Sequence, residues 1–376
     1  MNILINLSTL KKGGGQNVAL NFLESFSRIK ENDHKIVFVV VNGSELDNFL
    51  KTRKYPFILY MPANPILRMI KEVFTGGFLI KKYSIDVIYT YFGVGLYPRN
   101  IPQISGSADS NIYFPEIDFW SSYTGLSKMI KVLIDKYRIW GLKRMTAIIY
   151  ENKSMLIKGK ELFGVKNSIF IKPSININYF YKDYYLPSNI NQKSKKGLFL
   201  CGWQKNKNYE IIPLIAAILK KMDYDFHFIF TAPMDNSTAH LEFKQLLIDY
   251  DVTERISIIG GVKKEEIQSL YKQIDVVFLL SKLESFSNNI IEAWHFKKPL
   301  IISDDLWAKS ICMDAAVYVN RDDEKEISSS IIEILENKDL RELIISNGNN
   351  MIGTYPSIDE RTEKELDYIR YIYETN

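Results

Sequence analysis

The first half of the chain alternates short apolar runs with stretches whose apolar residues recur at helical spacing. Apolar runs at 3–7, 36–41 and 86–91 predict strands. After the first run, the glycines Gly13, Gly14 and Gly15 form a turn before a helix whose apolar face comprises Val18, Leu20, Phe22, Leu23 and Phe26. Because continuous β-branched runs are typical of parallel strands buried on both faces, we expect parallel strand–helix–strand units here.

The second half shows the same alternation more regularly. Apolar runs predict strands at 197–201, 225–231, 256–259, 276–280 and 299–303. Between them, periodic stretches predict helices at 209–221, 240–250, 264–273 and 288–295. The sequence therefore predicts an α/β protein with two Rossmann-like, doubly wound domains. Such sheets bind ligands beyond the carboxyl ends of their strands, so we expect the two domains to face a central cleft.

The domain boundaries follow from a loss of periodicity. Residues 184–196 are polar and are predicted to be the linker between an N-terminal domain, 1–183, and a C-terminal domain, 197–355. The last segment, 356–376, contains a charged amphipathic helix at 357–373. We expect this helix to pack back towards the N-terminal domain.

Composition narrows the class of protein. The 376 residues are 46% hydrophobic and 24% charged, which is enough apolar material for two cores and excludes a disordered or collagen-like chain. Only Cys201 and Cys312 occur, so neither a disulfide framework nor a cysteine zinc site is expected. No apolar run has the length of a membrane span, and the first residues predict a strand, not a signal peptide. We therefore expect a cytoplasmic protein.

The strongest chemical signal follows the strand at 276–280. Glu284 lies in a small polar loop, and Glu292 follows eight positions later on the helix that this loop opens. A loop entering a helix presents free N–H groups and the positive end of the helix dipole, which suits a phosphate. Carboxylates beside it would accept hydrogen bonds from the hydroxyl groups of a ribose and a sugar. The structural alternative is a capping glutamate followed by an ordinary helix glutamate.

This segment resembles the donor-binding signature of retaining glycosyltransferases with the GT-B fold, most closely family 4, the glycosyltransferases group 1. Other segments match in the same order. Gly13-Gly14-Gly15 resembles the family's glycine-rich loop, 171–180 the crossing to the second domain, and 201–208 the phosphate loop. Residues 260–271 resemble the loop and helix near the nucleotide base. The resemblance is specific over 197–305 and implies a place in assembly of bacterial surface polysaccharide, either O-antigen of lipopolysaccharide or capsule.

The resemblance also implies roles for individual residues. Glu292 would accept the ribose hydroxyls, Glu284 would contact the donor sugar, and Lys207, with Lys205 as the alternative, would neutralise the departing β-phosphate. Fixed positive groups stabilise the charge that develops on the leaving diphosphate. The implied donor-binding residues are Gly14, Gly15, Gly202, Lys205, Lys207, Val262, Glu284, Ser285, Phe286, Ser287, Asn288, Asn289 and Glu292.

The chain departs from the family pattern at two places. The family's phosphate-loop arginine falls at Trp203 or Gln204, and no histidine occurs in the stretch 102–111 of the first domain. Asp109 is the candidate for acid/base or acceptor-orienting work there. With it, the candidate acceptor-side residues are Ser105, Ser107, Asn111 and Glu116.

We expect neither a metal nor a cofactor. The pairs Asp223/Asp225 and Asp249/Asp251 fit a D-x-D metal pattern, but turn chemistry explains both better. The triple glycine lacks the G-x-G-x-x-G spacing of a dinucleotide site.

Charge is unevenly distributed along the chain. Residues 1–180 carry 24 Lys and Arg against 13 Asp and Glu, a net charge of +11, whereas the whole chain is +4. Residues 66–82 and 127–145 combine cations with many apolar side chains. These segments either lie on an anionic membrane surface or pack their apolar faces on the sheet. Nucleic acid is not expected, because no binding motif occurs and the second half is acidic.

Together these features predict a metal-independent glycosyltransferase, peripheral on the inner face of the cytoplasmic membrane. It would transfer a sugar from a nucleotide sugar, a UDP-sugar before a GDP-sugar, to a polyprenyl-diphosphate-linked saccharide. The alternatives are a non-catalytic GT-B partner or scaffold protein, which the missing arginine and histidine favour, and a nucleotide-sugar epimerase of similar fold.

Overall fold

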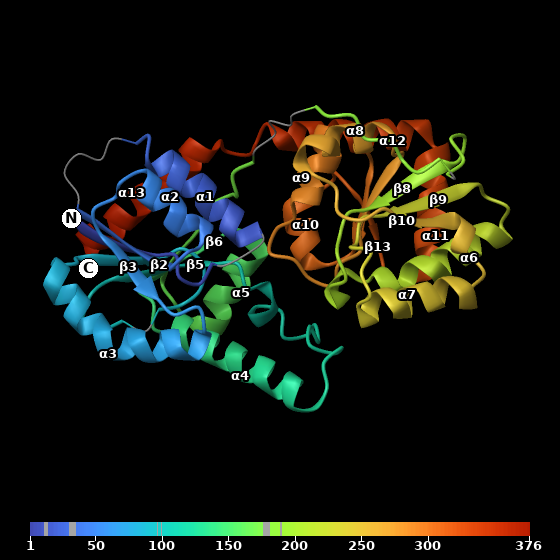
Figure 1. The fold of residues 1–376 in the computed structure, drawn as a ribbon. Coiled ribbons are helices and arrows are strands. Elements are labelled where there is room, and N and C mark those ends of the chain that lie inside the picture. The colour runs from blue at the N-terminus through green and yellow to red at the C-terminus, as the bar shows by residue number, and fades with distance from the viewer. Residues whose placement is uncertain (11–13, 30–34, 96, 99, 176–180, 189) are drawn as a thin grey trace. The chain divides into compact units, whose positions relative to one another are not determined.

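The first part of the molecule is built on a parallel sheet of seven strands in the order β3-β2-β1-β4-β5-β6-β7 (Figure 1). The strands are β1 Asn2–Asn6, β2 Lys35–Val41, β3 Ile58–Met61, β4 Val87–Thr90, β5 Gln103–Ser107, β6 Ala147–Tyr150 and β7 Asn167–Phe170. Leu4 and Ile5 point to opposite faces of β1, and both are completely buried. The continuous apolar runs therefore form strands covered by helices on both faces.

The computed structural model describes residues 1–10, 14–29, 35–95, 97–98, 100–175, 181–188 and 190–376. These residues divide into two units, Met1–Ile175 with Pro356–Asn376, and Asn176–Tyr355. The helices of the first unit are α1 Gly14–Phe26, α2 Glu45–Thr52, α3 Pro65–Tyr83, α4 Gly125–Leu142, α5 Lys153–Phe163 and α13 Ile358–Thr375. No described helix is both long and apolar enough to span a bilayer.

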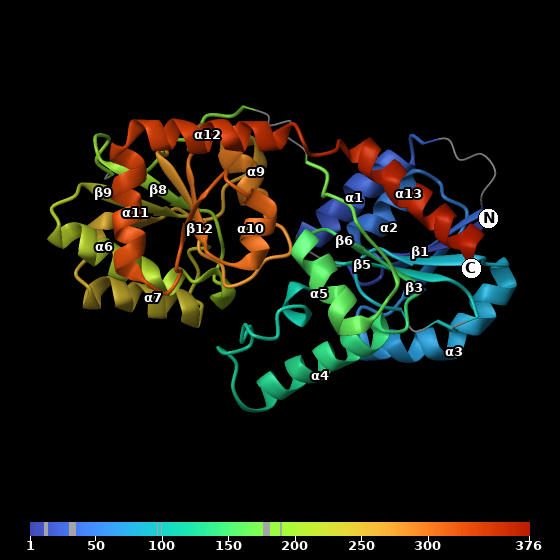
Figure 2. The same cartoon turned by 180° about the vertical axis from the view of Figure 1, so that it is seen from behind.

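The second unit has a parallel sheet of six strands in the order β10-β9-β8-β11-β12-β13 (Figure 2). They are β8 Lys195–Phe199, β9 Phe226–Phe230, β10 Ile256–Ile258, β11 Val276–Leu279, β12 Leu300–Ser303 and β13 Val317–Val319. The helices are α6 Ile212–Lys221, α7 Thr238–Asp249, α8 Ile267–Lys272, α9 Asn288–His295, α10 Leu306–Cys312, α11 Glu324–Glu336 and α12 Lys338–Ile352. The predicted doubly wound α/β class is confirmed.

Aromatic rings fill the core of the second unit. Phe199 and Phe278 on neighbouring strands stack with their ring centroids 5.0 Å apart. Gly197 on β8 must be glycine, because a Cβ there would lie 2.4 Å from the Phe278 ring and 2.6 Å from the Phe226 ring. The missing side chain leaves room for rings on both neighbouring strands.

The C-terminal helix α13 is part of the first unit. Its side chains Leu366, Ile369 and Ile372 are buried in the same core as Phe22 of α1. The buried Arg361 on this helix bridges two carboxylates, Glu365 and Glu151, with an N–O distance of 2.7 Å to each. The ion pair to Glu151 and the shared core hold the end of the chain in the first unit.

The predicted linker lies elsewhere. Residues 184–196 belong to the second unit, and β8 already begins at Lys195. Leu186 and Ile190 are buried, and the backbone N–H of Tyr184 donates to the Ser269 Oγ at 3.0 Å. These two isolated apolar residues anchor an otherwise polar stretch to the second unit. A periodicity pattern does not reveal such isolated anchors. The chain passes between the units at 175/176 and 355/356.

Candidate functional site

The order of the second sheet locates a natural binding point. From β8 the chain moves outward through β9 and β10 on one side, and through β11, β12 and β13 on the other. The direction of winding therefore reverses between β8 and β11, and ligands of open α/β sheets bind beyond the strand ends at such a point. The loops after these two strands are 200–208 and 280–287, which contain most of the predicted donor residues.

Two hydrogen bonds tie these loops together. The backbone N–H of Lys282 donates to the Asn206 carbonyl at 2.8 Å. The Asn289 carboxamide, on the first turn of α9, donates to the Leu200 carbonyl at 2.7 Å. Asn289 is therefore a positioning residue that fixes the start of α9 against the end of β8.

Lys207 and Glu284 meet at this point. The Lys207 Nζ lies 2.5 Å from the Glu284 Oε1, and the two side chains are 20% and 15% exposed. Lys207 is the last residue of a single 3₁₀ turn, Lys205–Lys207. This turn fixes the backbone from which the Lys207 side chain extends. Partial burial strengthens the attraction relative to an exposed surface pair. The structure thus brings together the predicted phosphate cation and the predicted sugar-binding carboxylate.

Lys205, the alternative cation, faces elsewhere. Its ammonium lies 3.2 Å from a Glu210 carboxylate oxygen and 3.8 Å from one of Glu242 on α7. Of the two lysines of the loop, Lys207 is the one that contacts Glu284.

The loop before α9 presents the helix N-terminus. Ser287 occupies the N-cap position with an extended backbone, and its side chain does not cap the helix. Ser285 and Phe286 are partly exposed, and Asn288 is exposed. The first turn of α9 therefore combines the positive end of a helix dipole with accessible polar residues, which suits an anion.

Glu292 lies on α9 next to a residue that sequence reasoning missed. The buried Tyr271 of α8 donates its hydroxyl to the Glu292 Oε2 at 3.2 Å. This bond orients the carboxylate while leaving it partly exposed. The helix predicted at 264–273 includes Tyr271, but the sequence does not indicate which carboxylate its hydroxyl reaches.

Trp203 and Gln204 are the two positions at which the family's phosphate-loop arginine is expected. The Trp203 ring stacks on His240 with centroids 5.3 Å apart, and its Nε1 donates to the Pro233 carbonyl at 2.8 Å. The side chain is therefore held against α7. Gln204 is exposed, and a Cβ at Gly202 would lie 3.1 Å from the Gln204 side chain.

The remaining predicted donor residues lie on other loops. Val262 is partly exposed between β10 and the 3₁₀ turn Lys264–Glu266. Gly14 and Gly15 begin α1 of the first unit, after the loop that follows β1, and Gly13 lies outside the described residues. A Cβ at Gly15 would lie 3.1 Å from the Leu10 side chain, so the helix start packs closely on that loop.

Two predicted acceptor-side serines are used by the fold itself. Ser105 and Ser107 lie within β5 and are buried. The Ser105 hydroxyl donates to the Gly93 carbonyl at 2.6 Å, and that of Ser107 is hydrogen-bonded to the Tyr113 hydroxyl. Neither hydroxyl is presented to solvent.

Asp109 follows β5 and lies in a charged cluster. Arg138 of α4 pairs with Asp109 at 3.3 Å and with Asp135 at 3.2 Å. The Asn111 carboxamide donates to Asp135 at 2.7 Å. Burial raises the pKa of Asp109, Arg138 opposes that change, and Asp135 adds to it. The side chain is still 34% exposed, so it can meet a ligand. Glu116, also predicted here, is half-exposed and pairs with Lys158.

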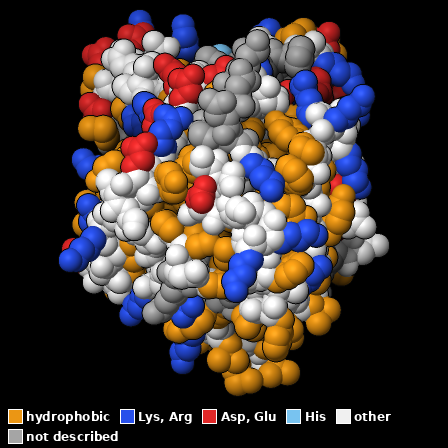
Figure 3. Space-filling view, turned by 90° about the vertical axis from the view of Figure 1, so that its left-hand side faces the viewer, with side chains coloured by type: hydrophobic (Ala, Val, Ile, Leu, Met, Phe, Trp, Pro, Cys, Tyr) orange, Lys and Arg blue, Asp and Glu red, His pale blue; other side chains and the backbone are white. Residues whose placement is uncertain are grey.

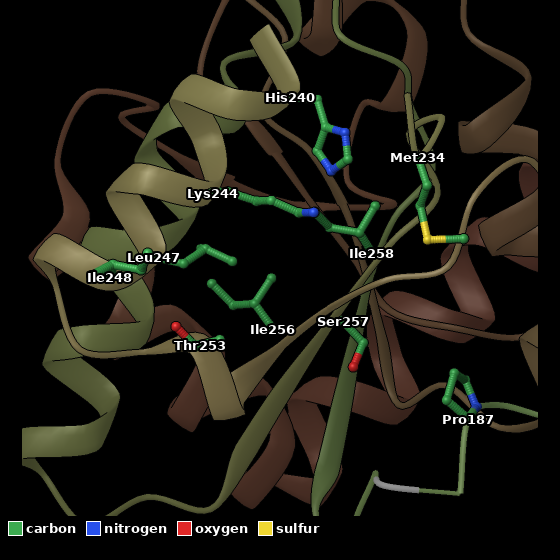
Figure 4. Close-up of a pocket in the computed structure, with 10 residues that line it drawn as sticks. All are labelled: Pro187, Met234, His240, Lys244, Leu247, Ile248, Thr253, Ile256, Ser257 and Ile258. Atoms are coloured by element: carbon green, nitrogen blue, oxygen red, sulfur yellow. The ribbon is translucent and has the colours of Figure 1, made fainter. Parts of the chain in front are cut away.

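A separate cavity of about 380 Å³ lies beside α7 and β10 of the second unit (Figure 4). It is lined by α7 and β10 residues that include His240, Lys244 and Ser257, and it contains none of the predicted donor residues. Within the described residues, no group of His, Cys, Asp or Glu has a metal-binding arrangement.

Comparison with known proteins agrees with the resemblance seen in the sequence. Residues 186–351 match the family described as glycosyl transferases group 1, which confirms the predicted resemblance to that family over most of the second unit. The curated O-antigen chain mannosyltransferase RfbU of Salmonella typhimurium is 29% identical over 115 residues. That match spans 31% of this chain and 31% of the relative.

Solved structures establish the fold over the full chain. A sucrose-phosphate synthase from Thermosynechococcus elongatus has a TM-score of 0.74 at 13% identity and covers 100% of both chains. A glycosyltransferase from Rickettsia africae has a TM-score of 0.69 at 17% identity, covering 100% of this chain and 99% of that one. Anabaena HepE, solved with UDP-glucose, has a TM-score of 0.68 at 15% identity over 98% and 99%. The GT-B prediction is confirmed.

Proposed function

We propose that this chain, whose second unit is a group 1 glycosyltransferase domain, is a retaining glycosyltransferase that uses a nucleotide diphosphate sugar. The Lys207–Glu284 pair at the switch point of the second sheet carries the proposal. A cation paired with the loop that leads into α9 supports binding of a diphosphate at the start of that helix. The pair also places a carboxylate where sugar hydroxyls would lie.

Each residue has a defined role in the proposed reaction. The bond between the sugar C1 and the β-phosphate oxygen breaks, and its electron pair stays on the phosphate. The acceptor oxygen forms the new bond to C1 from the same face, and its proton passes to the departing phosphate. Lys207 and the amides of 285–288 stabilise the phosphate charge. Glu284 accepts hydrogen bonds from the sugar, and Glu292 from the ribose.

Lys207 must exchange partners when the donor binds. In the structure its ammonium is paired with the Glu284 carboxylate. A diphosphate carries more negative charge than one carboxylate and would draw the ammonium towards it. Glu284 would then be available to accept hydrogen bonds from the sugar. Because the cation is a side chain, we propose that no metal is required.

We propose a UDP-sugar as donor, with a GDP-sugar as the second choice. HepE, which shares the fold, was solved with UDP-glucose, and this supports a uridine nucleotide. The proposed acceptor is a polyprenyl-diphosphate-linked saccharide in O-antigen or capsule assembly, and the curated name of the Salmonella relative supports it. A lipid-linked acceptor would place the enzyme on the cytoplasmic face of an anionic membrane.

One observation favours a second candidate, a non-catalytic GT-B partner. The family's phosphate-loop arginine falls at Trp203 or Gln204, and Trp203 packs against His240. A protein of this kind would bind nucleotide without turnover and would support another transferase.

Turnover separates these candidates. The purified protein is incubated with UDP- and GDP-sugars and a bacterial lipid extract containing polyprenyl-diphosphate saccharides, with EDTA throughout. Release of nucleotide diphosphate that requires the lipid, with the anomeric configuration retained by proton NMR, is the expected result. Nucleotide binding without release would support the non-catalytic partner. Inversion would contradict the retaining mechanism.

A further inference from the structure

Helix α3 presents its apolar side to solvent. Its buried positions are Glu72, Gly76 and Ile80, which recur every four residues. Six exposed apolar side chains share another face at helical spacing: Ile66, Leu67, Ile70, Val73, Phe74 and Phe78. Phe74 is 81% exposed and Phe78 is 64% exposed. Surface helices of globular proteins normally show the reverse arrangement, with the apolar stripe on the core.

Helix α4 repeats this arrangement. Its buried residues are Gly141 and Leu142, at its C-terminal end. Exposed apolar side chains occur along most of its length, among them Leu126, Met129, Ile130, Leu133 and Trp140. The idea that these basic segments bury their apolar faces on the sheet is therefore wrong for these eleven side chains, which we call the α3–α4 surface.

The two helices lie on the same side of the first unit. Figures 1 and 2 show them in succession along its lower edge. Burial raises the pKa of Tyr137 on α4 to about 12, and Glu72 and Arg68 of α3 lie close enough to affect it. The space-filling view shows hydrophobic side chains gathered along this edge, with Lys and Arg side chains among them (Figure 3). Large exposed apolar patches rimmed by polar residues mark interaction sites.

The charge of the surface selects the partner. Helix α3 carries four cations and one carboxylate, and so does α4. The carboxylate of α3 is the buried Glu72, and that of α4 is Asp135, which already accepts hydrogen bonds from Asn111 and Trp120. A second copy of this chain would bring one cationic face against another. An anionic partner is complementary instead.

Cations also lie beside the aromatic residues of the surface. The Lys82 Nζ is 5.8 Å from the centre of the Phe78 ring, and the Arg144 guanidinium carbon is 4.5 Å from the centre of the Trp140 ring. Long cationic side chains can reach headgroups while neighbouring aromatic and aliphatic groups enter the acyl boundary. We infer that the α3–α4 surface docks on an anionic lipid bilayer by inserting its apolar side chains at the interface.

Insertion has a signature that purely electrostatic attachment lacks. Surface attraction to anionic lipid is screened by salt, whereas burial of apolar side chains is not. We therefore expect bound protein to persist at high salt once vesicles contain anionic lipid. Release of all bound protein by salt would contradict insertion.

The test uses the full chain and vesicles of phosphatidylcholine, with or without phosphatidylglycerol. Phe74→Ser with Phe78→Ser should lower the partition coefficient for the mixed vesicles at least tenfold. The matched control is Leu306→Ser with Leu343→Ser in the second unit, where exposure is 59% and 56%. The control should bind as the wild type does. Circular dichroism and thermal unfolding check that both variants fold.

A position-specific signal completes the test. Brominated lipid should quench part of the tryptophan fluorescence, and Trp140→Phe should remove that quenched part. Equal vesicle binding by the Phe74/Phe78 variant, or quenching unchanged by Trp140→Phe, would overturn the inference. A wild-type dimer that the same substitutions convert to monomer would assign the surface to a second copy. The inference does not depend on the proposed transferase activity. Nucleotide binding by the Phe74/Phe78 variant should equal that of the wild type, whether or not its vesicle binding falls.

Discussion

The carboxyl edges of the two sheets use their polar residues differently. In the second unit, Lys207 and Glu284 come from loops after neighbouring strands, and their side chains meet at the switch point. In the first unit, Ser105 and Ser107 lie within β5, and their hydroxyls bond inside the fold. A polar residue in a loop beyond a strand end can meet a ligand. A polar residue inside a central strand is buried and must find its partner in the protein.

The largest effect should come from removing the cation at the switch point. Lys207→Ala should lower turnover about 10²- to 10³-fold, the usual cost of one lost group that stabilises developing charge. The measurement is nucleotide diphosphate release from the donor that the protein binds.

Lys205→Ala is the matched control, because it removes a lysine from the same 3₁₀ turn whose ammonium pairs with Glu210. It should change turnover less than about threefold, since exposed ion pairs contribute little. Equal losses in both variants would show that Lys207 has no special role.

Ribose binding should depend on Glu292 and, to a lesser degree, on Tyr271. Glu292→Ala should weaken nucleotide affinity about tenfold or more, because a hydrogen bond to a charged group is worth about 1.5–3 kcal/mol. Tyr271→Phe removes only the hydroxyl that orients the carboxylate, so its effect should be smaller. Isothermal titration calorimetry, with the nucleotide that the wild type binds, measures the affinity of both variants. If Tyr271→Phe lost more nucleotide affinity than Glu292→Ala, the ribose contact would have to be assigned to Tyr271 and not to Glu292.

The serines of β5 should affect stability and not chemistry. Ser105→Ala removes the donor to the Gly93 carbonyl and should cost about 1 kcal/mol in the free energy of unfolding. Turnover per folded molecule should change less than about twofold, because the Ser105 hydroxyl is bonded within the fold. Urea unfolding and the nucleotide-release assay give the two numbers. If the variant were as stable as the wild type but had strongly reduced turnover, Ser105 would have to be assigned to the acceptor site after all.

Asp109 should have the smallest effect, and its sign depends on pH. Burial raises its pKa in the folded protein, so the folded state binds more protons than the unfolded state as pH rises above the ordinary aspartate range. The charged Asp109 carboxylate therefore lowers the free energy of unfolding at neutral pH. This loss is absent below the pKa of the unfolded chain, where the carboxyl is protonated in both states. The Tm of Asp109→Asn relative to that of the wild type should therefore be higher at neutral pH than in acid. A difference that is larger in acid would contradict this sign.

Most of the fold could be predicted, because buried parallel strands require continuous apolar runs. The run at 276–280 forms β11 at Val276–Leu279, and the helix predicted at 288–295 is α9. Strand β5, Gln103–Ser107, could not be predicted, because two serines and a glycine interrupt its apolar pattern. It is a strand because it pairs with β4 and β6 on either side. Local patterns do not contain that long-range pairing.

The donor site was predictable to the level of the loop, not of the contact. Spacing identified Glu284 and Glu292, and the family resemblance implied Lys207 as the phosphate cation, with Lys205 as the alternative. In the structure Lys207 pairs with Glu284 and Lys205 pairs with Glu210, and these contacts support the choice of Lys207. Likewise, composition marked 66–82 and 127–145 as basic and apolar, but tertiary structure shows that their apolar stripes face solvent.

Thermal unfolding with UDP, GDP, CDP and ADP, in EDTA and then with magnesium, tests the donor site most directly. A nucleotide at a hundred times its dissociation constant adds about 2.7 kcal/mol to the folded state, which raises Tm by several degrees. We predict that one nucleotide, UDP first, raises Tm without metal and that Glu292→Ala reduces this shift. No shift with any nucleotide, or a shift that appears only with magnesium, would contradict the account.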